Sequence, residues 1–313
     1  MNHTANHTTN HTANHTANLT MTRYILAKQN YINLSTSRFQ KGGDVKLFDR
    51  LLENYVYQRG LNDNEGHRDI IIDGKKYSST IYGEVFTEDV DGLNSLKLFI
   101  NIAKHKDVDF FGDLGSGRGM LSAALNDGKG INKTYAIEIV SKRHDEAVKF
   151  MKNVLNVDNS WNVETSRLAE AIGHAIIPDN VNDPSEYLNR VVFTHKENGK
   201  VLEYLNGDML YVDFTYLLDG YNKPMFWISN LCFPEITLLL FDKFKDTLPV
   251  GTIVILSRPP TDVEQYGFSK MHNPELGINN GRLILPQTWN TKDYVECLEF
   301  AGMGSTVMNR SII

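Results

Sequence analysis

A glycine-dense segment at residues 113–119 constrains the fold of this chain more than any other feature. It follows an apolar run that ends in Phe111-Gly112, and it reads Asp113-Leu114-Gly115-Ser116-Gly117-Arg118-Gly119. Because glycine has no Cβ and accepts positive φ, such a turn lets the backbone come within contact distance of a ligand. A strand followed by this kind of turn is typical of the ligand-binding edge of a doubly wound α/β sheet.

An acidic residue in the next apolar segment indicates an adenosine ligand. Glu138 closes the run 134–137, where a doubly wound sheet places a carboxylate on the two ribose hydroxyls. The glycine spacing departs from the dinucleotide pattern G-x-G-x-x-G, and Asp113 disfavours a pyrophosphate while favouring a cationic amino acid group. The pattern therefore predicts S-adenosylmethionine as cofactor, with S-adenosylhomocysteine as product. The alternative is a tight structural turn.

Composition indicates a globular intracellular protein without a metal. The chain has 313 residues, of which 41% are hydrophobic, and no stretch approaches the ~20 uninterrupted apolar residues of a membrane helix. The N-terminus lacks the pattern of a signal peptide, so we expect no membrane partner. Cys232 and Cys297 are too few for a disulfide framework or a zinc site, and reduced thiols suit the cytosol or nucleus.

The chain divides into three expected parts. Residues 1–20 repeat Asn-His-Thr-Ala and, as a polar low-complexity tract, are expected to be disordered. Residues 21–100 form a mostly helical N-terminal region, with a helix at 45–59 and a cofactor-closing loop near 80–86. Residues 101–313 form the catalytic domain.

Hydrophobic periodicity predicts an α/β fold within that domain. Helices are expected at 93–103, 142–155, 167–177 and 234–246, and strands at 134–137, 225–228 and 252–256. Asn198-Gly199 between the apolar runs 191–194 and 201–205 predicts a hairpin with a two-residue turn. Residues 282–300 indicate two further strands joined by a polar turn at 290–292. This order of elements indicates an α/β fold, and the resemblance to methyltransferases given below implies the class I S-adenosylmethionine-dependent type, with a Rossmann-like, seven-stranded sheet.

Charge is unevenly distributed. The net charge of -6 argues against a globally basic nucleic-acid binder. Residues 21–60, however, carry seven basic and three acidic side chains. This basic arm is either a solvated surface or a contact with a phosphate backbone. Its basic residues are Arg23, Lys28, Arg38, Lys41, Lys46, Arg50 and Arg59.

Four clusters fall at predicted strand ends, where ligands bind in open α/β sheets. They are the glycine turn, Glu138, Gly207-Asp208-Met209 and Ser229-Asn230-Leu231-Cys232-Phe233. In methyltransferases of this fold, an acidic residue after the third strand typically contacts the adenine amino group, and an apolar neighbour stacks on the ring. Asp208 and Met209 match these positions. A structural turn at 206–208 is the alternative.

The sequence resembles the disruptor of telomeric silencing family, the histone-lysine methyltransferases that lack a SET domain. The resemblance covers roughly residues 80–300. Its motifs are Tyr82-Gly83-Glu84, the glycine turn, Glu138, Gly207-Asp208, Ser229-Asn230-Leu231-Cys232-Phe233 and Ile253-Val254-Ile255-Leu256-Ser257-Arg258-Pro259. The resemblance implies that the Tyr-Gly-Glu loop closes over the methionine end of the cofactor. It also implies that the asparagine block borders the sulfonium and the entering lysine, and that Trp289 lines the lysine channel.

The chain departs from the family pattern at three positions. Ser229 replaces the first of two consecutive asparagines, Val85 replaces a threonine, and Met120 replaces a glutamine, so two polar cofactor contacts are lost or replaced. The resemblance therefore implies a divergent member. The expected cofactor-binding residues are Tyr82, Gly83, Glu84, Val85, Phe111, Gly112, Asp113, Leu114, Gly115, Ser116, Gly117, Arg118, Gly119, Met120, Glu138, Asp208 and Met209.

Methyl transfer from a sulfonium is an in-line displacement, so the protein's main task is to place a neutral amine about 3 to 3.5 Å from the methyl carbon. An apolar channel lowers the pKa of a lysine and so favours the neutral form. Phe233 and Trp289 are the expected channel walls, and Ser229 and Asn230 the expected residues at the reacting centre. Ordinary core packing is the alternative for both aromatic residues.

The expected function is methylation of a lysine in the globular core of nucleosomal histone H3, in the nucleus, with the basic arm contacting the DNA backbone. One alternative is a nucleic-acid amino-group methyltransferase. Such enzymes need Pro-Pro-aromatic after the asparagine, and this chain has Leu231-Cys232-Phe233. The other alternative is a weakly active cofactor-binding or nucleosome-binding module.

Overall fold

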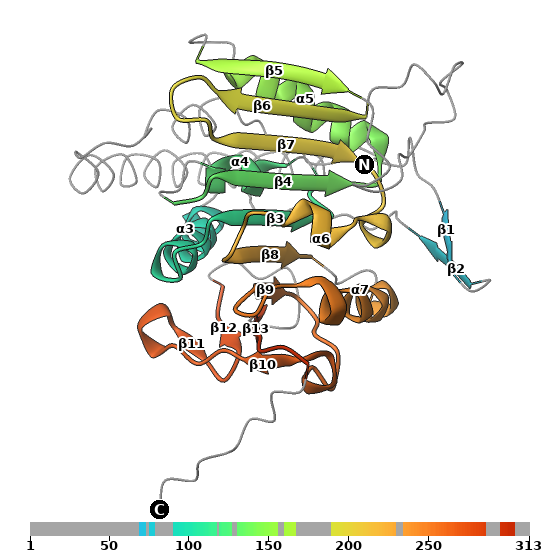
Figure 1. Cartoon of the computed structure of the whole chain (residues 1–313), viewed down its shortest axis with the longest axis vertical. Helices are drawn as coiled ribbons and strands as arrows, with labels where there is room; N and C mark the ends of the chain where they lie inside the picture. Colours follow the sequence, from blue (N-terminus) through green and yellow to red (C-terminus); the bar gives the residue numbers. More distant parts are fainter. Residues whose placement is uncertain are drawn as a thin grey trace, which may run out of the picture.

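The structure is a computed structural model of the whole chain (Figure 1). It describes residues 69–72, 75–78, 90–117, 119–126, 130–155, 160–166, 189–229, 234–285 and 295–303. Within these ranges, a central sheet is covered by helices on both faces (Figure 1). None of the helices in these ranges is long and apolar enough to cross a membrane.

Five parallel strands form the centre of the sheet. They are β3 (Phe110–Leu114), β4 (Lys133–Glu138), β7 (Val201–Asn206), β8 (Pro224–Ile228) and β9 (Ile253–Leu256). They lie in the order β7-β4-β3-β8-β9, so the chain fills one side of β3 first and then the other. In such doubly wound sheets, the strand order reverses beside the first strand, and ligands bind at the carboxyl ends of the strands there.

The expected seven-stranded sheet is present but is part of a larger one. The strand β13 (Val295–Phe300) runs antiparallel to β9, and β10 (Phe268–Lys270) runs antiparallel to β13, which completes the seven. Four more strands extend this core to eleven: β5 (Trp161–Ser166), β6 (Arg190–His195), β11 (Ile278–Asn279) and β12 (Arg282–Leu283). The shortest of these have two residues each, too few to show a periodic pattern.

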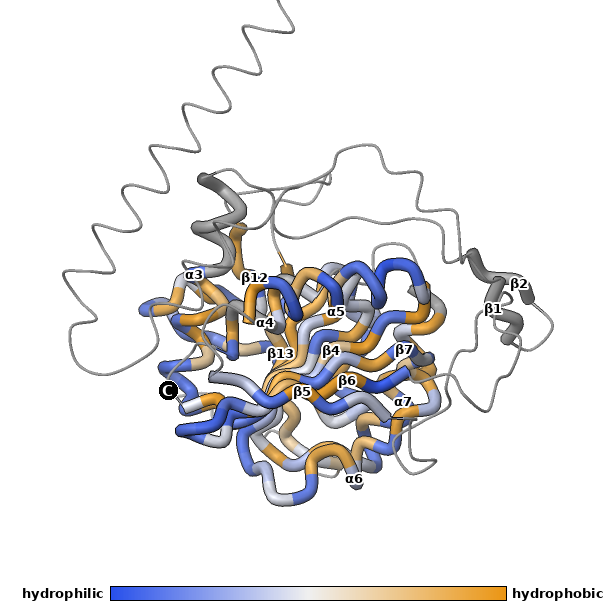
Figure 2. Tube along the Cα trace, turned by 90° about the horizontal axis from the view of Figure 1, so that it is seen from above, coloured by the Kyte–Doolittle hydropathy of each residue, from blue (hydrophilic) through white to orange (hydrophobic). Residues whose placement is uncertain are grey.

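Two apolar cores lie on opposite faces of the sheet. The helices α3 (Val90–His105), α4 (Met120–Asn126) and α5 (Ser141–Leu155) cover one face, and α6 (Phe214–Leu217) and α7 (Pro234–Thr247) cover the other. Neighbouring residues of β8 serve different cores, because side chains alternate along a strand: Trp227 packs with Phe99, and Phe226 with Phe244. Figure 2 shows apolar residues along the central strands and hydrophilic residues on α5.

The helices expected at 93–103, 142–155 and 234–246 are confirmed as α3, α5 and α7. The strands expected at 134–137, 225–228 and 252–256 are confirmed as β4, β8 and β9. The helices expected at 45–59 and 167–177 lie outside the described residues.

The hairpin of β6 and β7 is confirmed, but the expectation of a two-residue turn is wrong. The His195 amide donates to the Lys200 carbonyl at 2.9 Å, which leaves residues 196–199 in the loop. Only Gly199 adopts a positive φ, of 70°, whereas a two-residue Asn-Gly turn needs both residues there. The ring nitrogen Nδ1 of His195 accepts the amides of Glu197 and Asn198 instead.

The description of residues 21–100 as mostly helical is incomplete. Two strands, β1 (Asp69–Ile72) and β2 (Lys75–Ser78), pair in a separate antiparallel sheet. The β-branched run Ile70-Ile71-Ile72 favours a strand, and Asp73-Gly74 is a hairpin signal in the sequence. The two strands expected in 282–300 are confirmed as the antiparallel pair β12 and β13, and the turn at 290–292 lies outside the described residues.

Candidate functional site

The glycine turn connects β3 to α4 at the carboxyl edge of the sheet. Gly115, Gly117 and Gly119 have φ of 84°, 55° and 67°, a region that residues with a Cβ adopt only under strain. The amides of Gly115 and Ser116 both donate to the carbonyl of Ile137, at 3.0 and 2.9 Å. The turn is therefore closed against the end of β4, and its glycines are required by its backbone conformation.

Glu138 connects this turn to the start of α5. Its Oε2 accepts the amide of Gly117 at 2.8 Å, and its Oε1 accepts the amide of Val140 at 2.8 Å. The Nη1 atom of Arg143 lies 3.7 Å from Oε1, and both side chains are buried. The amide of Ile139 also contributes to holding this carboxylate, so backbone amides use most of its lone pairs.

Burial shifts the pKa of Glu138 and of its neighbour His144. Burial raises the pKa of Glu138, and neither Arg143 nor the backbone amides of Val140 and Gly117 fully offsets it. Burial also lowers the pKa of His144 to about 4, so this neighbour is neutral at pH 7. Arg143 is therefore the cation beside Glu138. A ligand hydroxyl that donates to Glu138 would favour its ionised form.

Asp113 lies at the other end of the turn. Its side chain is buried, and its Oδ2 accepts the hydroxyl of Ser122 in α4 at 3.1 Å. Behind the turn, the hydroxyl of Tyr204 donates to the carbonyl of Gly119 at 3.0 Å. A Cβ on Gly119 would collide with the ring of Tyr204, so this glycine is fixed by packing as well as by its φ.

Three of the expected cofactor-binding residues belong to the cores. Phe111 and Leu114 are fully buried, on opposite faces of the sheet. A Cβ on Gly112 would collide with the ring of Phe226. These residues build the strand that carries the turn, and their contact with a cofactor stays a prediction.

Asp208 and Met209 follow β7 at the same edge. The Oδ1 atom of Asp208 accepts the amide of Leu210 at 2.9 Å and caps the 3-10 helix η3 (Met209–Tyr211). Met209 is partly buried and packs on the core beneath α6 and α7. Asp208 thus has a structural role as a cap of the 3-10 helix that follows residues 206–208, and the contacts of both residues with an adenine stay predictions.

A buried asparagine at this edge is not evident from the sequence motifs. Asn206 donates from Nδ2 to the Glu138 carbonyl at 2.7 Å and accepts the hydroxyl of Ser141 at 2.8 Å. Its own carbonyl accepts from Nδ2 of Asn189 at 3.0 Å. This network fixes the end of β4 to β7 and α5. A polar residue closing an otherwise apolar strand is the signal that would have indicated it.

Ser229 follows β8 directly. Because Ile228 pairs with Leu114, Ser229 lies at the same edge as the glycine turn. The structure therefore brings together the turn, Glu138, Asp208 and Ser229. The remaining site residues lie outside the described residues: Tyr82, Gly83, Glu84, Val85, Arg118, Asn230, Phe233 and Trp289. Of Met120, the structure describes only its helical backbone.

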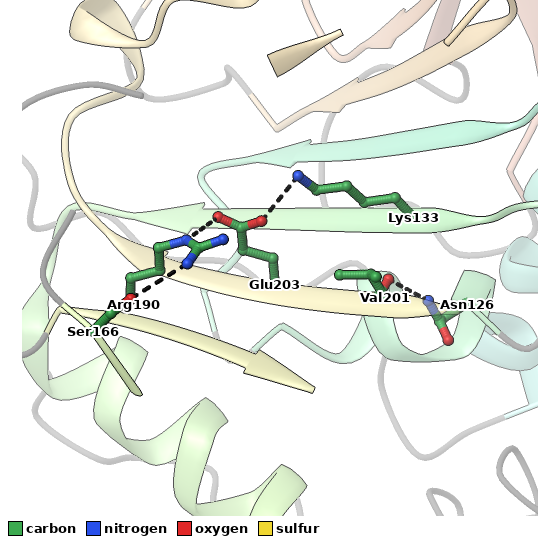
Figure 3. Close-up of polar contacts among 6 residues, drawn as sticks. All are labelled: Asn126, Lys133, Ser166, Arg190, Val201 and Glu203. Carbon is green, nitrogen blue, oxygen red and sulfur yellow. Dashed lines mark hydrogen bonds and ion pairs between the residues drawn. The ribbon is translucent and has the colours of Figure 1, made fainter. Parts of the chain in front are cut away.

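A second polar cluster connects neighbouring strands of the sheet around Glu203 (Figure 3). Glu203 in β7 contacts Lys133 in β4 at 2.9 Å and Arg190 in β6 at 2.8 Å, and Nη1 of Arg190 donates to the hydroxyl of Ser166 in β5 at 3.3 Å (Figure 3). Burial alone would raise the pKa of Glu203, but the two cations outweigh it and lower that pKa. The cluster joins four strands, so we interpret it as structural. No group of three or more potential metal ligands occurs in the described part of the chain.

The strand order and the antiparallel β13 beside β9 define a Rossmann-like α/β fold of the class I methyltransferase type, with a ligand edge at the ends of β3, β4, β7 and β8. No protein-family model matches the sequence, and no curated protein matches it.

Several solved structures are similar at low identity. A mutant of MtNAS in complex with S-adenosylmethionine is 14% identical, with a TM-score of 0.37, over 67% of this chain and 63% of that one. The methyltransferase domain of bacterial CtHen1-CN is 13% identical, with a TM-score of 0.41, and the match covers 67% of this chain and 99% of that one. An rRNA methylase from Streptococcus thermophilus is 14% identical, with a TM-score of 0.35, and the match covers 66% of this chain and 94% of that one. The chain thus spans less than two thirds of MtNAS, and the fold assignment rests on the strand order.

Proposed function

We propose that this chain is an S-adenosylmethionine-dependent methyltransferase that acts, in the nucleus, on a lysine in the core of nucleosomal histone H3. The observation that carries the cofactor part is the buried carboxylate of Glu138, which joins the glycine turn to the end of β4. The histone part is supported by the sequence resemblance.

The carboxyl edge of the sheet suits a ligand with an adenosine and a cationic arm. Glu138 follows β4, at the edge where doubly wound sheets bind a ribose, and its carboxylate is an acceptor for a ribose hydroxyl. Asp113 favours the ammonium of a methionine group over a phosphate. The positive φ of Gly117 and Gly119 allows the backbone to approach the ligand without a Cβ. When bound, the cofactor supplies a methyl group on a sulfonium.

The residues after β8 support the proposal that the methyl acceptor is a lysine. Ser229 lies beside the glycine turn because Ile228 pairs with Leu114. By resemblance, Ser229 and Asn230 border the reacting centre, and Phe233 and Trp289 line a channel for the lysine. An apolar channel favours the neutral amine, which is the nucleophile. No protein group has to form a covalent bond with the substrate.

The cofactor part is tested by titration calorimetry on the full chain. We expect S-adenosylmethionine and S-adenosylhomocysteine to bind at a single site, and NAD not to compete with them. Binding of NAD in preference to both would contradict the proposal.

The acceptor part is tested by incubating the full chain with methyl-labelled cofactor and recombinant mononucleosomes, with excess S-adenosylhomocysteine as control. Label in histone H3 supports the proposal. Label in the DNA instead supports a nucleic-acid methyltransferase. Intact cofactor binding without label in any component indicates a binding module.

A further inference from the structure

One lysine of α7 holds the segment that follows β7. Nζ of Lys243 donates to the carbonyls of Leu210 and Val212, at 2.6 and 2.9 Å. These carbonyls lie 33 and 31 residues before Lys243 in the chain, in η3 and at its C-cap. Lys243 therefore connects α7 to residues 208–212, which include Asp208 and Met209, the two residues expected at the adenine.

Lys243 and Asp208 both bind Leu210, one at each of its backbone polar groups. Oδ1 of Asp208 accepts the amide of Leu210, and Nζ of Lys243 donates to the carbonyl of Leu210. The position of the Asp208 carboxylate thus depends on Leu210, and the position of Leu210 depends on Lys243. At the other end of the segment, Val212 is fully buried in the core beneath α6 and α7.

The charge of Lys243 also acts on this segment. Burial lowers the pKa of Lys243, and the nearby carboxylates of Asp213 and Asp208 oppose this shift. The ammonium therefore attracts Asp208 in addition to binding the two carbonyls. Packing of α7 does not by itself require a lysine at this position, since Leu240 and Phe244 supply apolar contacts to the core.

We propose that Lys243 is a positioning residue for the cofactor, which sets residues 208–212 so that Asp208 can accept the adenine amino group. This inference rests on the proposed function, because it assumes that an adenine binds beside Asp208. Lys243 does not contact the ligand and acts through the carbonyls of Leu210 and Val212. The helix α7 begins at Pro234, directly after residues 229–233, so it joins the expected reacting centre to the adenine end of the site.

Two substitutions of Lys243 separate its donors from its length. A lysine has three N–H donors and no acceptor, so it can bind two carbonyls at once. A methionine is similar in length but has no donor, so Lys243→Met removes both hydrogen bonds and the charge. An arginine has five N–H donors and a permanent charge, so Lys243→Arg can bind both carbonyls.

The test compares two ligands by titration calorimetry on the full chain. They are S-adenosylhomocysteine and its analogue without the 6-amino group of the adenine. We expect the wild type to bind the first about tenfold more tightly, the contribution of one hydrogen bond. Lys243→Met should bind both ligands with equal affinity, and Lys243→Arg should restore the preference. Lys245→Met is the matched control on α7, at a lysine that pairs with the exposed Asp242, and should keep the preference.

The ratio of the two affinities separates positioning from a structural role. Loss of a structural contact lowers the melting temperature but does not distinguish two ligands that differ by one amino group. A wild-type ratio in Lys243→Met would therefore overturn the inference, whatever its melting temperature. So would equal affinity of the wild type for both ligands. If Lys243→Met does not fold, Lys243→Gln keeps one donor and serves for the same comparison. Failure of the proposed function would appear separately, as missing binding of S-adenosylhomocysteine or missing methyl transfer by the wild-type chain.

Discussion

The amide nitrogen of Gly117 lies 2.8 Å from Oε2 of Glu138, so the glycine turn after β3 and the end of β4 share one buried carboxylate. The other oxygen of this carboxylate holds the amide of Val140 at the start of α5. Three segments therefore keep their relative positions through one side chain. A ligand that binds Glu138 meets a preorganised edge, which reduces the ordering that binding would otherwise require.

Glu138→Gln should weaken cofactor binding by about tenfold. A glutamine presents one acceptor and one donor, so one of the two backbone amides, or the ribose hydroxyl in its place, loses its acceptor. Calorimetry with S-adenosylmethionine checks this. Glu164→Gln, on an exposed position of β5, is the matched control and should bind like the wild type. Equal affinity of the two variants would exclude Glu138 from the cofactor site.

The pH dependence of the wild-type affinity should report Glu138. Its folded pKa is raised by burial, so protonation begins above the usual carboxyl pKa of about 4.3. As the pH falls through the folded pKa, the ionised acceptor is lost and the dissociation constant rises. Without ligand, the folded chain binds the extra proton in this window, so the stability contribution of Glu138 falls as the pH rises through it. Both trends should be missing in Glu138→Gln.

Two substitutions of Asp208 can distinguish a contact with the adenine from a role as a helix cap. Asp208→Ser keeps a cap for the amide of Leu210 but is too short to reach an adenine amino group. We expect this variant to keep its melting temperature and to bind S-adenosylmethionine about tenfold more weakly, the loss of about one hydrogen bond. Asp208→Ala should lose both properties. Wild-type affinity in Asp208→Ser would show that the residue is a cap alone.

Gly119→Ala should destabilise the fold by roughly 2–5 kcal/mol. The alanine must adopt a left-handed φ, at ~1–2 kcal/mol, and must displace the ring of Tyr204, at ~1–3 kcal/mol. Urea unfolding measures the change. Gly199→Ala is the control, because its φ is 70° but nothing lies within 4 Å of the added Cβ. Gly199→Ala should lose only the stability that the left-handed φ costs. Equal losses of stability in both variants would refute the argument that Gly119 is packed against Tyr204.

Glu203→Gln should destabilise the fold by about 2–4 kcal/mol, since it leaves two cations without their partner. The effect falls below that of a fully buried pair because Lys133 and Arg190 are partly exposed. The pKa of Glu203 is lowered, so its stabilisation is complete above about pH 4.3 and is lost as the pH falls through the folded pKa. Asp242→Asn, in the surface pair with Lys245, should leave the stability nearly unchanged. A loss in Glu203→Gln that is the same at pH 7 and pH 3 would contradict this account.

Charge reversal of Lys41, Lys46 and Arg50 should weaken mononucleosome binding and reduce its dependence on salt, because phosphate contacts release counterions. Gel-shift titrations at two salt concentrations measure both effects. The control reverses the same number of charges elsewhere, on α5 and on the loop between β6 and β7, at Lys149, Lys152 and Lys196. Unchanged affinity of the arm variant at low salt would remove the arm from the interface.

Strong periodicity made much of the fold predictable. The apolar residues of α5 recur at helical spacing, and β8 is an apolar run between turn signals, so both were evident. The strand β5 was not, because its side chains are largely exposed and carry no alternating pattern. The glycine turn and Glu138 were evident as a site because their spacing is local in sequence.

The contacts that complete the site depend on tertiary structure. Asn206 reaches Glu138 and Ser141 only because β7 lies beside β4, and nothing local in the sequence specifies that pairing. The role of Asp208 as a cap depends on the 3-10 helix after β7, which no sequence motif indicated.

The position of β13 in the sheet bears on synthesis of the protein. This strand, formed by residues 295–300, lies between β9 and β10, which the ribosome produces earlier. Until residue 300 has left the ribosome, the nascent chain exposes one unpaired edge of β9, and unpaired edges are templates for aggregation. Chaperone capture of nascent chains should therefore be strongest for those that stop between residues 257 and 294.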